Sequence, residues 1–224
     1  MSPKNAVLVL LSISALTWAG IRIFTSGDPM QNPLAHAVDA HERAGELLGE
    51  RVAKDLDRNG SILLLAPPAA PEGLAPGDAR VWMTRQTEGF VNALPDSITV
   101  QTLSVAVAQT REAHRQGGSG ELQWKDLRKA IENHPKVTAI VSLAGCPAIP
   151  ANADLPPFYV LSRSGDRIHA GMTAGRIPFA VVPNHSPVAM EDLRGDWFSV
   201  FYETVTPETI GAWHEAVQGP GDAK

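Results

Sequence analysis

The longest apolar stretch of the chain is at its N-terminus, where residues 6–24 (AVLVLLSISALTWAGIRIF) carry a single charge, Arg22. A helix of roughly 20 mainly apolar residues is long enough to span a bilayer. The small residues that a signal peptidase needs, such as Ala19, lie inside this stretch, and apolar residues continue beyond them. The pattern therefore predicts an uncleaved transmembrane helix, with a removed signal peptide as the alternative.

The charges around this segment predict its orientation. Lys4 and the terminal amine favour a cytoplasmic N-terminus, whereas Arg22 near the other end weakens that preference. We expect a single-pass protein of a bacterial inner membrane, with its C-terminal domain in the periplasm or on the extracellular side. Residues 1–24 are then the N-terminal signal-anchor helix, residues 25–33 a linker, residues 34–217 the extracytoplasmic α/β domain and residues 218–224 a flexible tail.

Beyond the linker, helical and strand patterns alternate. Apolar residues recur on one helical face from residue 34 to about residue 56, and Asp78 and Thr206 are suitable N-caps for later helices. Short apolar runs without alternation are typical of strands that are buried on both faces of a parallel sheet. Such a run occurs at 61–66, and further strands are expected at 98–107, 137–143, 158–162 and 178–182. Helices are expected at 121–133 and around 170–175, and an aromatic run at 197–202 suits an edge strand.

This alternation predicts how the elements are connected. Parallel neighbours cannot be joined by a tight hairpin, so strands and helices at this spacing indicate βαβ crossovers. We therefore expect an α/β fold, a doubly wound and mainly parallel sheet of about five strands with helices on both faces, preceded by one N-terminal transmembrane helix.

The composition argues against several classes of function. The net charge is −5 and no Lys/Arg-rich block occurs, so we expect no nucleic-acid partner. One cysteine cannot form an intramolecular disulfide, and the seven histidines show neither HxxxH nor HxH spacing, so no metal site is expected. No glycine-rich phosphate-binding motif follows the first predicted strand, where Pro67 and Pro68 lack the amide hydrogens that cradle phosphate. We expect no cofactor.

Four stretches of the chain are similar to a known family. They are GELLGERVAKDLDRNGSILLLAP (45–67), EGFVNALPDSITVQTLSV (88–105), LRKAIENHPKVTAIVSLAGCP (127–147) and AGMTAGRIPFAVVP (170–183). In the order of helix, strand and small residues they resemble one lobe of the type I periplasmic solute-binding proteins and the LacI-like sugar-binding domains. The resemblance implies a ligand-binding domain that performs no chemistry.

The chain also departs from this family in two ways. Family members have two lobes that close on a ligand, whereas this chain has residues for one lobe. The third predicted strand is followed by a long Pro/Ala-rich loop, residues 144–157, where the family usually has a helix. For these reasons no ligand-binding residue of the family is carried over to this sequence.

Candidate ligand-binding residues follow from the fold class. In doubly wound sheets, ligands bind beyond the carboxyl ends of the strands. Arg163 lies between two serines and could hold an anionic or hydroxylated ligand with its planar guanidinium, although the same residues also suit a solvated turn. The full set of candidates is Ser142, Cys146, Ser162, Arg163, Ser164, Asn184 and His185.

Cys146 raises the question of catalysis. It could be a reactive thiol with His169 or His185 as its base, but a lone cysteine is more often a small buried apolar residue. We assign no catalytic residue. The function that we expect is a membrane-anchored extracytoplasmic domain that binds a small polar solute or an envelope protein. A periplasmic hydrolase or transferase that uses Cys146, Arg163 and His185, and a structural scaffold domain of an envelope complex, are the alternatives.

Overall fold

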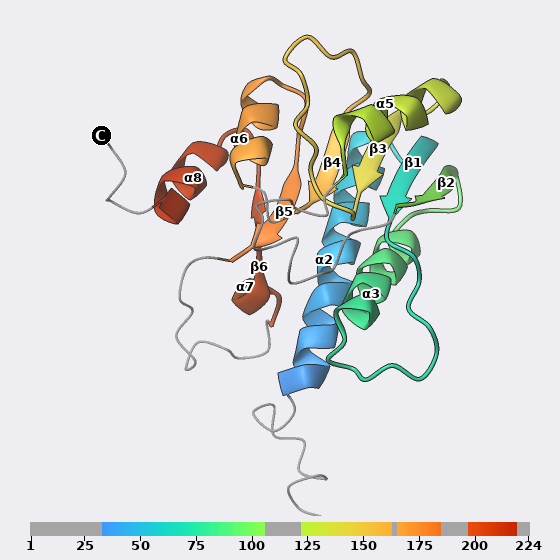
Figure 1. Cartoon of the computed structure of the whole chain (residues 1–224), viewed down its shortest axis with the longest axis vertical. Helices are drawn as coiled ribbons and strands as arrows, with labels where there is room; N and C mark the ends of the chain where they lie inside the picture. The colour runs from blue at the N-terminus through green and yellow to red at the C-terminus, as the bar shows by residue number, and fades with distance from the viewer. Residues whose placement is uncertain (1–32, 106–121, 163–164, 185–196, 219–224) are drawn as a thin grey trace, which may run out of the picture. The chain divides into compact units, whose positions relative to one another are not determined.

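The computed structural model describes residues 33–105, 122–162, 165–184 and 197–218, whose strands form one six-stranded sheet (Figure 1). The first five strands are parallel and the sixth is antiparallel to its neighbour. The spatial order is β2 (Ile98–Ser104), β1 (Gly60–Ala66), β3 (Ala139–Ser142), β4 (Phe158–Leu161), β5 (Ala180–Pro183) and β6 (Tyr202–Val205). The predicted α/β class and largely parallel sheet are confirmed, with six strands in a mixed sheet.

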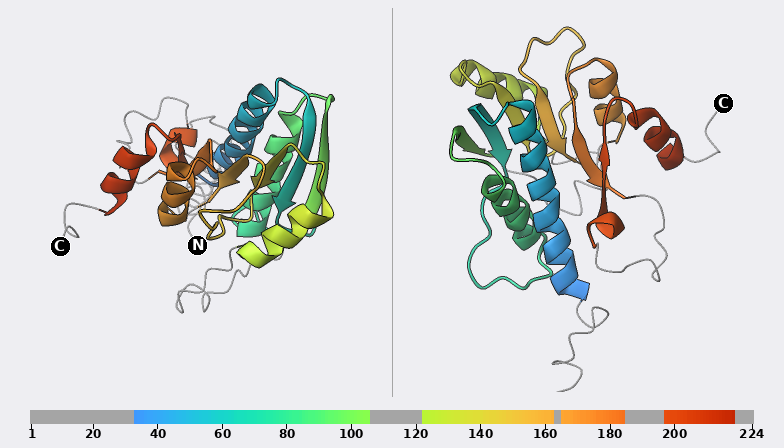
Figure 2. Two further views of the ribbon diagram at one scale, coloured as in Figure 1. Left: turned by 90° about the horizontal axis from the view of Figure 1, so that it is seen from above. Right: turned by 180° about the vertical axis from the view of Figure 1, so that it is seen from behind.

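Strand β1 lies at the centre of the core, because its side chains pack in the apolar clusters on both faces of the sheet. Ile62 and Leu64 pack in one apolar cluster with α2 (Pro33–Asp55) and α3 (Ala79–Asn92). Leu63 and Leu65 pack in the other, with α5 (Trp124–Asn133), α6 (Gly165–Thr173) and α8 (Ile210–Gln218). Figure 2 shows α2 and α3 together on one face. The uninterrupted apolar run of β1 is thus explained by helices on both faces.

Helices α2 and α3 approach each other closely at glycines. A Cβ atom on Gly45 would lie 2.0 Å from the carbonyl oxygen of Gln86, and one on Gly89 would lie 2.2 Å from the carbonyl oxygen of Glu42. No larger residue fits at either position without moving a backbone. The contact fixes the position of α3 along the axis of α2, and so the positions of the side chains that these two helices share.

One predicted strand is wrong. Residues 198–201 form a one-turn helix, α7 (Phe198–Phe201), and β6 begins only at Tyr202. The register explains the difference, because Tyr202 pairs with Pro183, the last residue of β5. Residues before Tyr202 have no strand beside them in β5, so their aromatic composition alone does not make them extended.

The boundaries predicted for the other elements differ less from those in the structure. The helix predicted around 170–175 begins earlier, at Gly165, and the long loop predicted over 144–157 is confirmed to contain no helix. In the described part of the chain, no helix combines the length and apolar character needed to cross a membrane. The span predicted at 6–24 lies outside the described residues. The chain divides into units 1–36 and 37–224, and every strand of the sheet belongs to the second unit.

Candidate functional site

The parallel strands β1 to β5 end along one edge of the sheet, which we call the carboxyl edge. The strand order reverses at β1, because the chain goes from β1 to β2 on one side and then to β3 on the other. Loops diverge at such a reversal and leave a crevice in which α/β proteins bind ligands. The carboxyl edge is therefore where a ligand site is expected.

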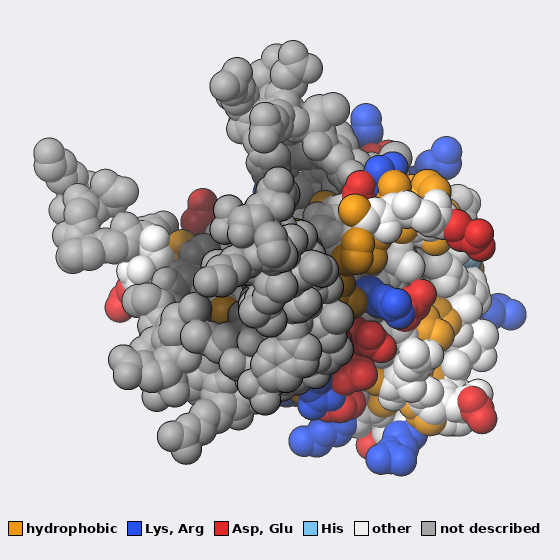
Figure 3. All heavy atoms as spheres, turned by 90° about the horizontal axis from the view of Figure 1, so that it is seen from below, with side chains coloured by type: hydrophobic (Ala, Val, Ile, Leu, Met, Phe, Trp, Pro, Cys, Tyr) orange, Lys and Arg blue, Asp and Glu red, His pale blue; other side chains and the backbone are white. Residues whose placement is uncertain are grey.

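Figure 3 views the molecule from below the orientation of Figure 1, and shows how charge is distributed over the described surface on that side. Lys and Arg side chains alternate with Asp and Glu side chains, and small groups of apolar side chains lie between them. On the described atoms that are visible there, no single sign of charge dominates.

Ser142 lies at the end of β3 and is fully buried. Its hydroxyl donates to the carbonyl oxygen of Gly145 at 2.7 Å and accepts from the amide of Ala144 at 3.3 Å. Gly145 has a φ of 101°, a conformation that favours glycine. The hydroxyl of Ser142 therefore closes the tight turn after β3, and its role toward a ligand stays a prediction.

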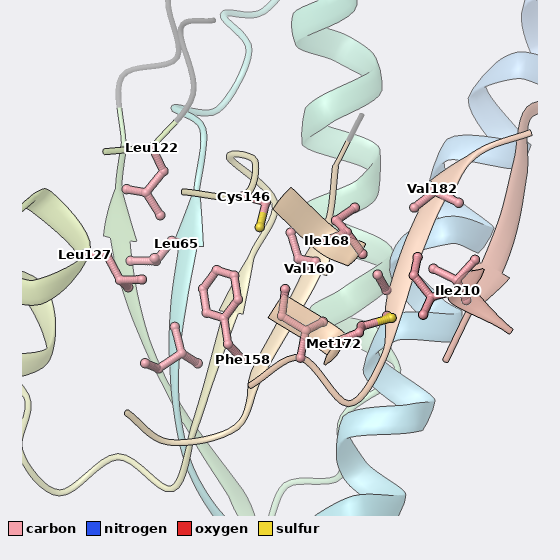
Figure 4. Close-up of a cluster of buried hydrophobic side chains, with 14 of the residues drawn as sticks. Leu65, Leu122, Leu127, Cys146, Phe158, Val160, Ile168, Met172, Val182 and Ile210 are labelled. Carbon is pink, nitrogen blue, oxygen red and sulfur yellow. The ribbon is translucent and has the colours of Figure 1, made fainter. Parts of the chain in front are cut away.

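Cys146 follows this turn and lies in the apolar core (Figure 4). Its exposed fraction is 0 %, and its Sγ atom lies 3.6 Å from the carbonyl oxygen of Pro147. The guanidinium of Arg167 donates to the carbonyl oxygen of Cys146 at 3.0 Å and fixes the backbone there. A nucleophilic thiol needs access to its substrate, so this burial favours the inert alternative for Cys146.

Ser162 and Asn184 follow the adjacent strands β4 and β5. The amide of Ser162 donates to the carbonyl oxygen of Val181 at 3.2 Å, and Ser162 is buried. The amide of Asn184 donates to the carbonyl oxygen of Phe201 at 3.0 Å, and its side-chain amide donates to the carbonyl oxygen of Ser199. Asn184 thus ties α7 to the end of β5.

The structure brings the four described candidates to the carboxyl edge of three neighbouring strands, β3, β4 and β5. The remaining candidates, Arg163, Ser164 and His185, lie outside the described residues.

A buried polar cluster near this edge, the His41 network, was not predicted. It consists of His41 on α2, Gln86 on α3 and Tyr202 at the start of β6, each at most 6 % exposed. Nε2 of Gln86 lies 2.9 Å from Nδ1 of His41 and 2.8 Å from Oη of Tyr202. Oη of Tyr202 lies 2.5 Å from Nδ1 of His41.

The tautomer of His41 sets the hydrogen-bond roles in the His41 network. With Nδ1 unprotonated, its one lone pair accepts from the hydroxyl of Tyr202, and Gln86 Nε2 donates to the oxygen of that hydroxyl. Nδ1 is then an acceptor, and the ring hydrogen of His41 is on Nε2. A closed network of this kind holds α2, α3 and β6 in one arrangement.

Aromatic rings surround the network. The ring of Trp82 is stacked on His41, with centroids 4.8 Å apart and planes 17° apart. The ring of Tyr202 meets His41 edge-on at 5.4 Å and is stacked with Phe198 at 5.9 Å. Trp82 and Phe198 are partly exposed, so the network supports aromatic surface at the carboxyl edge.

The first turn of α3 adds an ion pair beside Trp82. Oδ1 of Asp78 accepts from the amide of Arg80 at 2.9 Å and caps the helix, as predicted. Both carboxylate oxygens of Asp78 also accept from the guanidinium of Arg80, at 3.0 and 2.8 Å. These bonds lower the pKa of the Asp78 carboxyl to about 2. The indole N–H of Trp82 donates to the carbonyl oxygen of Pro76 at 2.8 Å, which fixes the ring.

The residues that the structure describes include no group of three His, Cys, Asp or Glu side chains suited to a metal ion. A groove of about 670 Å³ lies at the opposite, amino-terminal edge of the sheet, where α2 and α3 end. Its lining includes Glu50, Lys54, Asp57, Arg58 and Leu94. None of the predicted site residues lines it.

Sequence reasoning named no member of the His41 network as a candidate site residue. It gave no signal for Gln86 or Tyr202, because these residues meet His41 only through contacts across 45 and 161 positions. A sequence pattern within one element does not contain such information.

No protein-family model and no curated protein matches this chain. Solved structures match its fold. An arabinose binding protein from Geobacillus stearothermophilus is 13 % identical over 77 % of this chain, with a TM-score of 0.50. The sugar-binding protein of a sugar ABC transporter from Bacillus halodurans is 12 % identical over 77 % of this chain, also with a TM-score of 0.50. This chain spans 62 % and 64 % of those two chains. The predicted resemblance to type I solute-binding proteins is thereby confirmed as a resemblance in fold.

Proposed function

We propose that this chain is a membrane-tethered extracytoplasmic domain that binds a small polar solute at the carboxyl edge of its sheet and performs no chemistry. The observation that carries the proposal is the position of the His41 network, which supports the partly exposed ring of Trp82 at that edge. The solved structures with the same fold are described as sugar-binding proteins, so a sugar is the first solute to test.

The side chains at the start of α3 suit a hydroxylated ring. The faces of a sugar ring present C–H groups that pack on an aromatic plane, and its hydroxyls bond to planar polar side chains. Trp82 supplies the plane, and Asp78 with Arg80 supplies carboxylate and guanidinium groups in the same helical turn. Since this ion pair is partly exposed, its outer hydrogen-bonding sites are accessible to a solute.

The burial of Cys146 supports the absence of chemistry, because the hydrolase alternative requires a reachable nucleophile. With Ser142 held in its turn, the described candidates provide polar backbone and side-chain groups but no matched nucleophile and base. Their use as ligand contacts remains part of this proposal.

The binding proposal can be tested on the full-length protein in detergent. Isothermal titration with a panel of pentoses and hexoses should give saturable binding, and Trp82→Ala should weaken it by about tenfold or more, as expected for a lost stacking contact worth about 1.4 kcal/mol. Leu94→Ala is the matched control, because Leu94 is also partly buried but lines the groove at the amino-terminal edge of the sheet. Equal losses in the two variants, or turnover that depends on Cys146, would refute the proposal.

The tether needs a separate experiment. Residues 6–24 should keep the protein in the membrane fraction after alkaline carbonate washing, and a reporter enzyme that is active only outside the cytoplasm should be active when fused after residue 217. Release of the whole protein by the wash would argue for a cleaved signal peptide. That result would leave the binding proposal unaffected.

A further inference from the structure

One side of the one-turn helix α7 is apolar although it lies outside the core. Phe198 and Phe201 pack against the apolar cluster that α2 and α3 share with the sheet. Trp197 and Val200 are also three positions apart, on another side of the turn; they are partly exposed and belong to neither apolar cluster of the described residues. We call Trp197 and Val200 the outer pair. Tryptophan is enriched where one end of the side chain meets an apolar phase and the other meets water, so the outer pair has the composition of an interface.

The outer pair has a fixed position on the domain. The amide of Asn184 donates to the carbonyl oxygen of Phe201 at 3.0 Å, and its side-chain amide donates to the carbonyl oxygen of Ser199. The ring of Phe198 is stacked with that of Tyr202, with centroids 5.9 Å apart. Helix α7 is thus held to the end of β5 and the start of β6, and it presents the outer pair in one orientation.

The chain enters this domain at the same edge of the sheet. Helix α2 ends at Asp55, at the amino-terminal edge, and β1 begins there at Gly60. The part of α2 from Ala37, the first residue of the larger unit, to Asp55 is about 27 Å long, whereas β1 is about 20 Å long. Ala37 therefore lies at the carboxyl edge.

Helix α7 lies beside this point of entry. The centroid of the Phe201 ring is 6.3 Å from that of the His41 ring, and His41 is one helical turn along α2 from Ala37. Figure 1 shows α7 and the N-terminal half of α2 at the same end of the sheet. The outer pair and the entry of the chain therefore share one edge.

We propose that the outer pair rests on the surface of the bilayer, so that the carboxyl edge of the sheet faces the membrane. This arrangement rests on the membrane tether of the proposed function. Residues 25–36, which connect the predicted span to Ala37, reach at most about 40 Å when fully extended. A connection this short keeps the carboxyl edge near the lipid at an effective concentration on the order of millimolar, at which a weak contact is populated.

The outer pair suits lipid better than a protein partner. A stable protein interface buries about 800 Å² on each partner, and two side chains supply only a small part of that area. A tethered domain needs only a few apolar side chains at the boundary between headgroups and acyl chains, where tryptophan is enriched. Residues 197–201 include no charged side chain that would have to leave water. A solute bound beside Trp82, at the same edge, would then be exchanged close to the bilayer.

The contact can be measured on the full-length protein in phosphatidylcholine nanodiscs. Val200→Cys is labelled with a fluorophore, and lipids that carry a nitroxide near the headgroup quench fluorophores at the bilayer surface. Emission from position 200 should be quenched at least about fivefold more strongly than emission from Lys54→Cys, because the apolar side of an interfacial segment lies at the level of the headgroups. Lys54 is the matched control, since it is exposed and lines the groove at the amino-terminal edge. The wild type, whose one cysteine is buried, gives the labelling background.

A charge at the outer pair tests its part in the contact. Trp197→Glu in the labelled Val200→Cys protein should lower the quenching at least about twofold, because a carboxylate is costly to remove from water. Thr173→Glu adds the same charge to an exposed position at the end of α6 and should leave the quenching unchanged. Circular dichroism checks that the variants are folded.

The outcomes distinguish this membrane contact from the tether. Strong quenching at position 200 with weak quenching at position 54 supports the contact. Equal quenching at the two positions, in protein that residues 6–24 hold in the nanodisc, overturns it and leaves the tether intact. Protein that does not enter the nanodisc refutes the tether and the contact together. A photo-cross-link from position 200 to another protein in native membranes, without quenching in nanodiscs, would show that a membrane protein takes the place of lipid.

Discussion

Nδ1 of His41 lies 2.9 Å from Nε2 of Gln86, across the interface between α2 and α3. The distance depends on the glycines of that interface, because Gly45 and Gly89 let the two helices approach until backbone nearly meets backbone. Tyr202 closes the network from β6. Helix packing and the aromatic surface at the carboxyl edge are therefore one structural unit.

The close approach of α2 and α3 predicts that Gly45→Ala destabilises the protein. The added methyl would lie 2.0 Å from the carbonyl oxygen of Gln86, so the helices must separate, at a cost of about 2–3 kcal/mol in the free energy of unfolding. Gly211→Ala is the control, because a Cβ on this α8 residue meets nothing within 4 Å. That variant should be neutral or more stable by up to about 1 kcal/mol. Urea unfolding measures both, and equal effects would show that the close contact is not rigid.

Removal of the Tyr202 hydroxyl should destabilise the His41 network. Tyr202→Phe leaves Nδ1 of His41 and an amide hydrogen of Gln86 with fewer partners in a buried site, which costs about 1–3 kcal/mol. The same variant should also weaken solute binding, since Trp82 is stacked on His41. Thermal unfolding and titration of one preparation measure the two effects. Unchanged stability would mean that the hydroxyl contributes no net hydrogen bonding.

The environment of the Tyr159 hydroxyl predicts that the free energy of unfolding falls at alkaline pH. Its hydroxyl donates to Oδ2 of Asp55 at 3.0 Å, and burial together with this carboxylate raises the pKa of the phenol above its ordinary value of 10.0. The folded protein therefore holds the phenolic proton more tightly than the unfolded chain does. Its contribution to stability is full below about pH 10 and declines as the pH rises beyond that value, by up to about 1.4 kcal/mol per pH unit.

The measurement is unfolding by urea between pH 9 and 11. The wild type should lose stability more steeply than Tyr159→Phe, which has no phenolic proton at this position. Parallel curves for the two proteins would contradict the assignment.

Asp78 and Arg80 provide an NMR prediction. The carboxyl of Asp78 should titrate with a pKa of about 2, because Arg80 bonds to it through both side chain and backbone. Arg80→Ala should move this pKa toward the ordinary value of 3.8. Because the folded pKa is below the unfolded one, any contribution of this pair to stability is present above about pH 4 and is lost as the pH falls toward 2. No change of pKa in Arg80→Ala would show that the ion pair does not form in solution.

The sequence predicted much of the sheet because its strands depend on local signals. The run Ile62–Leu63–Leu64–Leu65 is apolar at every position, as expected of a strand that is covered on both faces. Asp78 likewise indicated the start of α3, because its side chain is suited to cap a helix. In contrast, Phe198 was assigned to a strand on composition, although the end of β5 at Pro183 decides where β6 can begin.

The candidate site was harder to predict for a physical reason. Ser142 and Asn184 were placed at the carboxyl edge by topology, but their hydrogen bonds to Gly145 and Ser199 depend on turns that sequence does not specify. The His41 network depends on three elements that are distant in the chain. Only its glycine-mediated helix contact could have given an advance signal, through the spacing of Gly45 and Gly49 on one face of α2.

Hydrogen exchange in the presence and absence of a bound sugar tests the central claim most directly. If the carboxyl edge is the binding edge, protection should increase at the start of α3 around Trp82 and in the turn after Ser142, and should stay constant at the amino-terminal edge around Asp57 and Pro95. Protection that increases instead along the groove lined by Glu50, Lys54 and Arg58 would place the ligand at the wrong edge of the sheet and contradict the account.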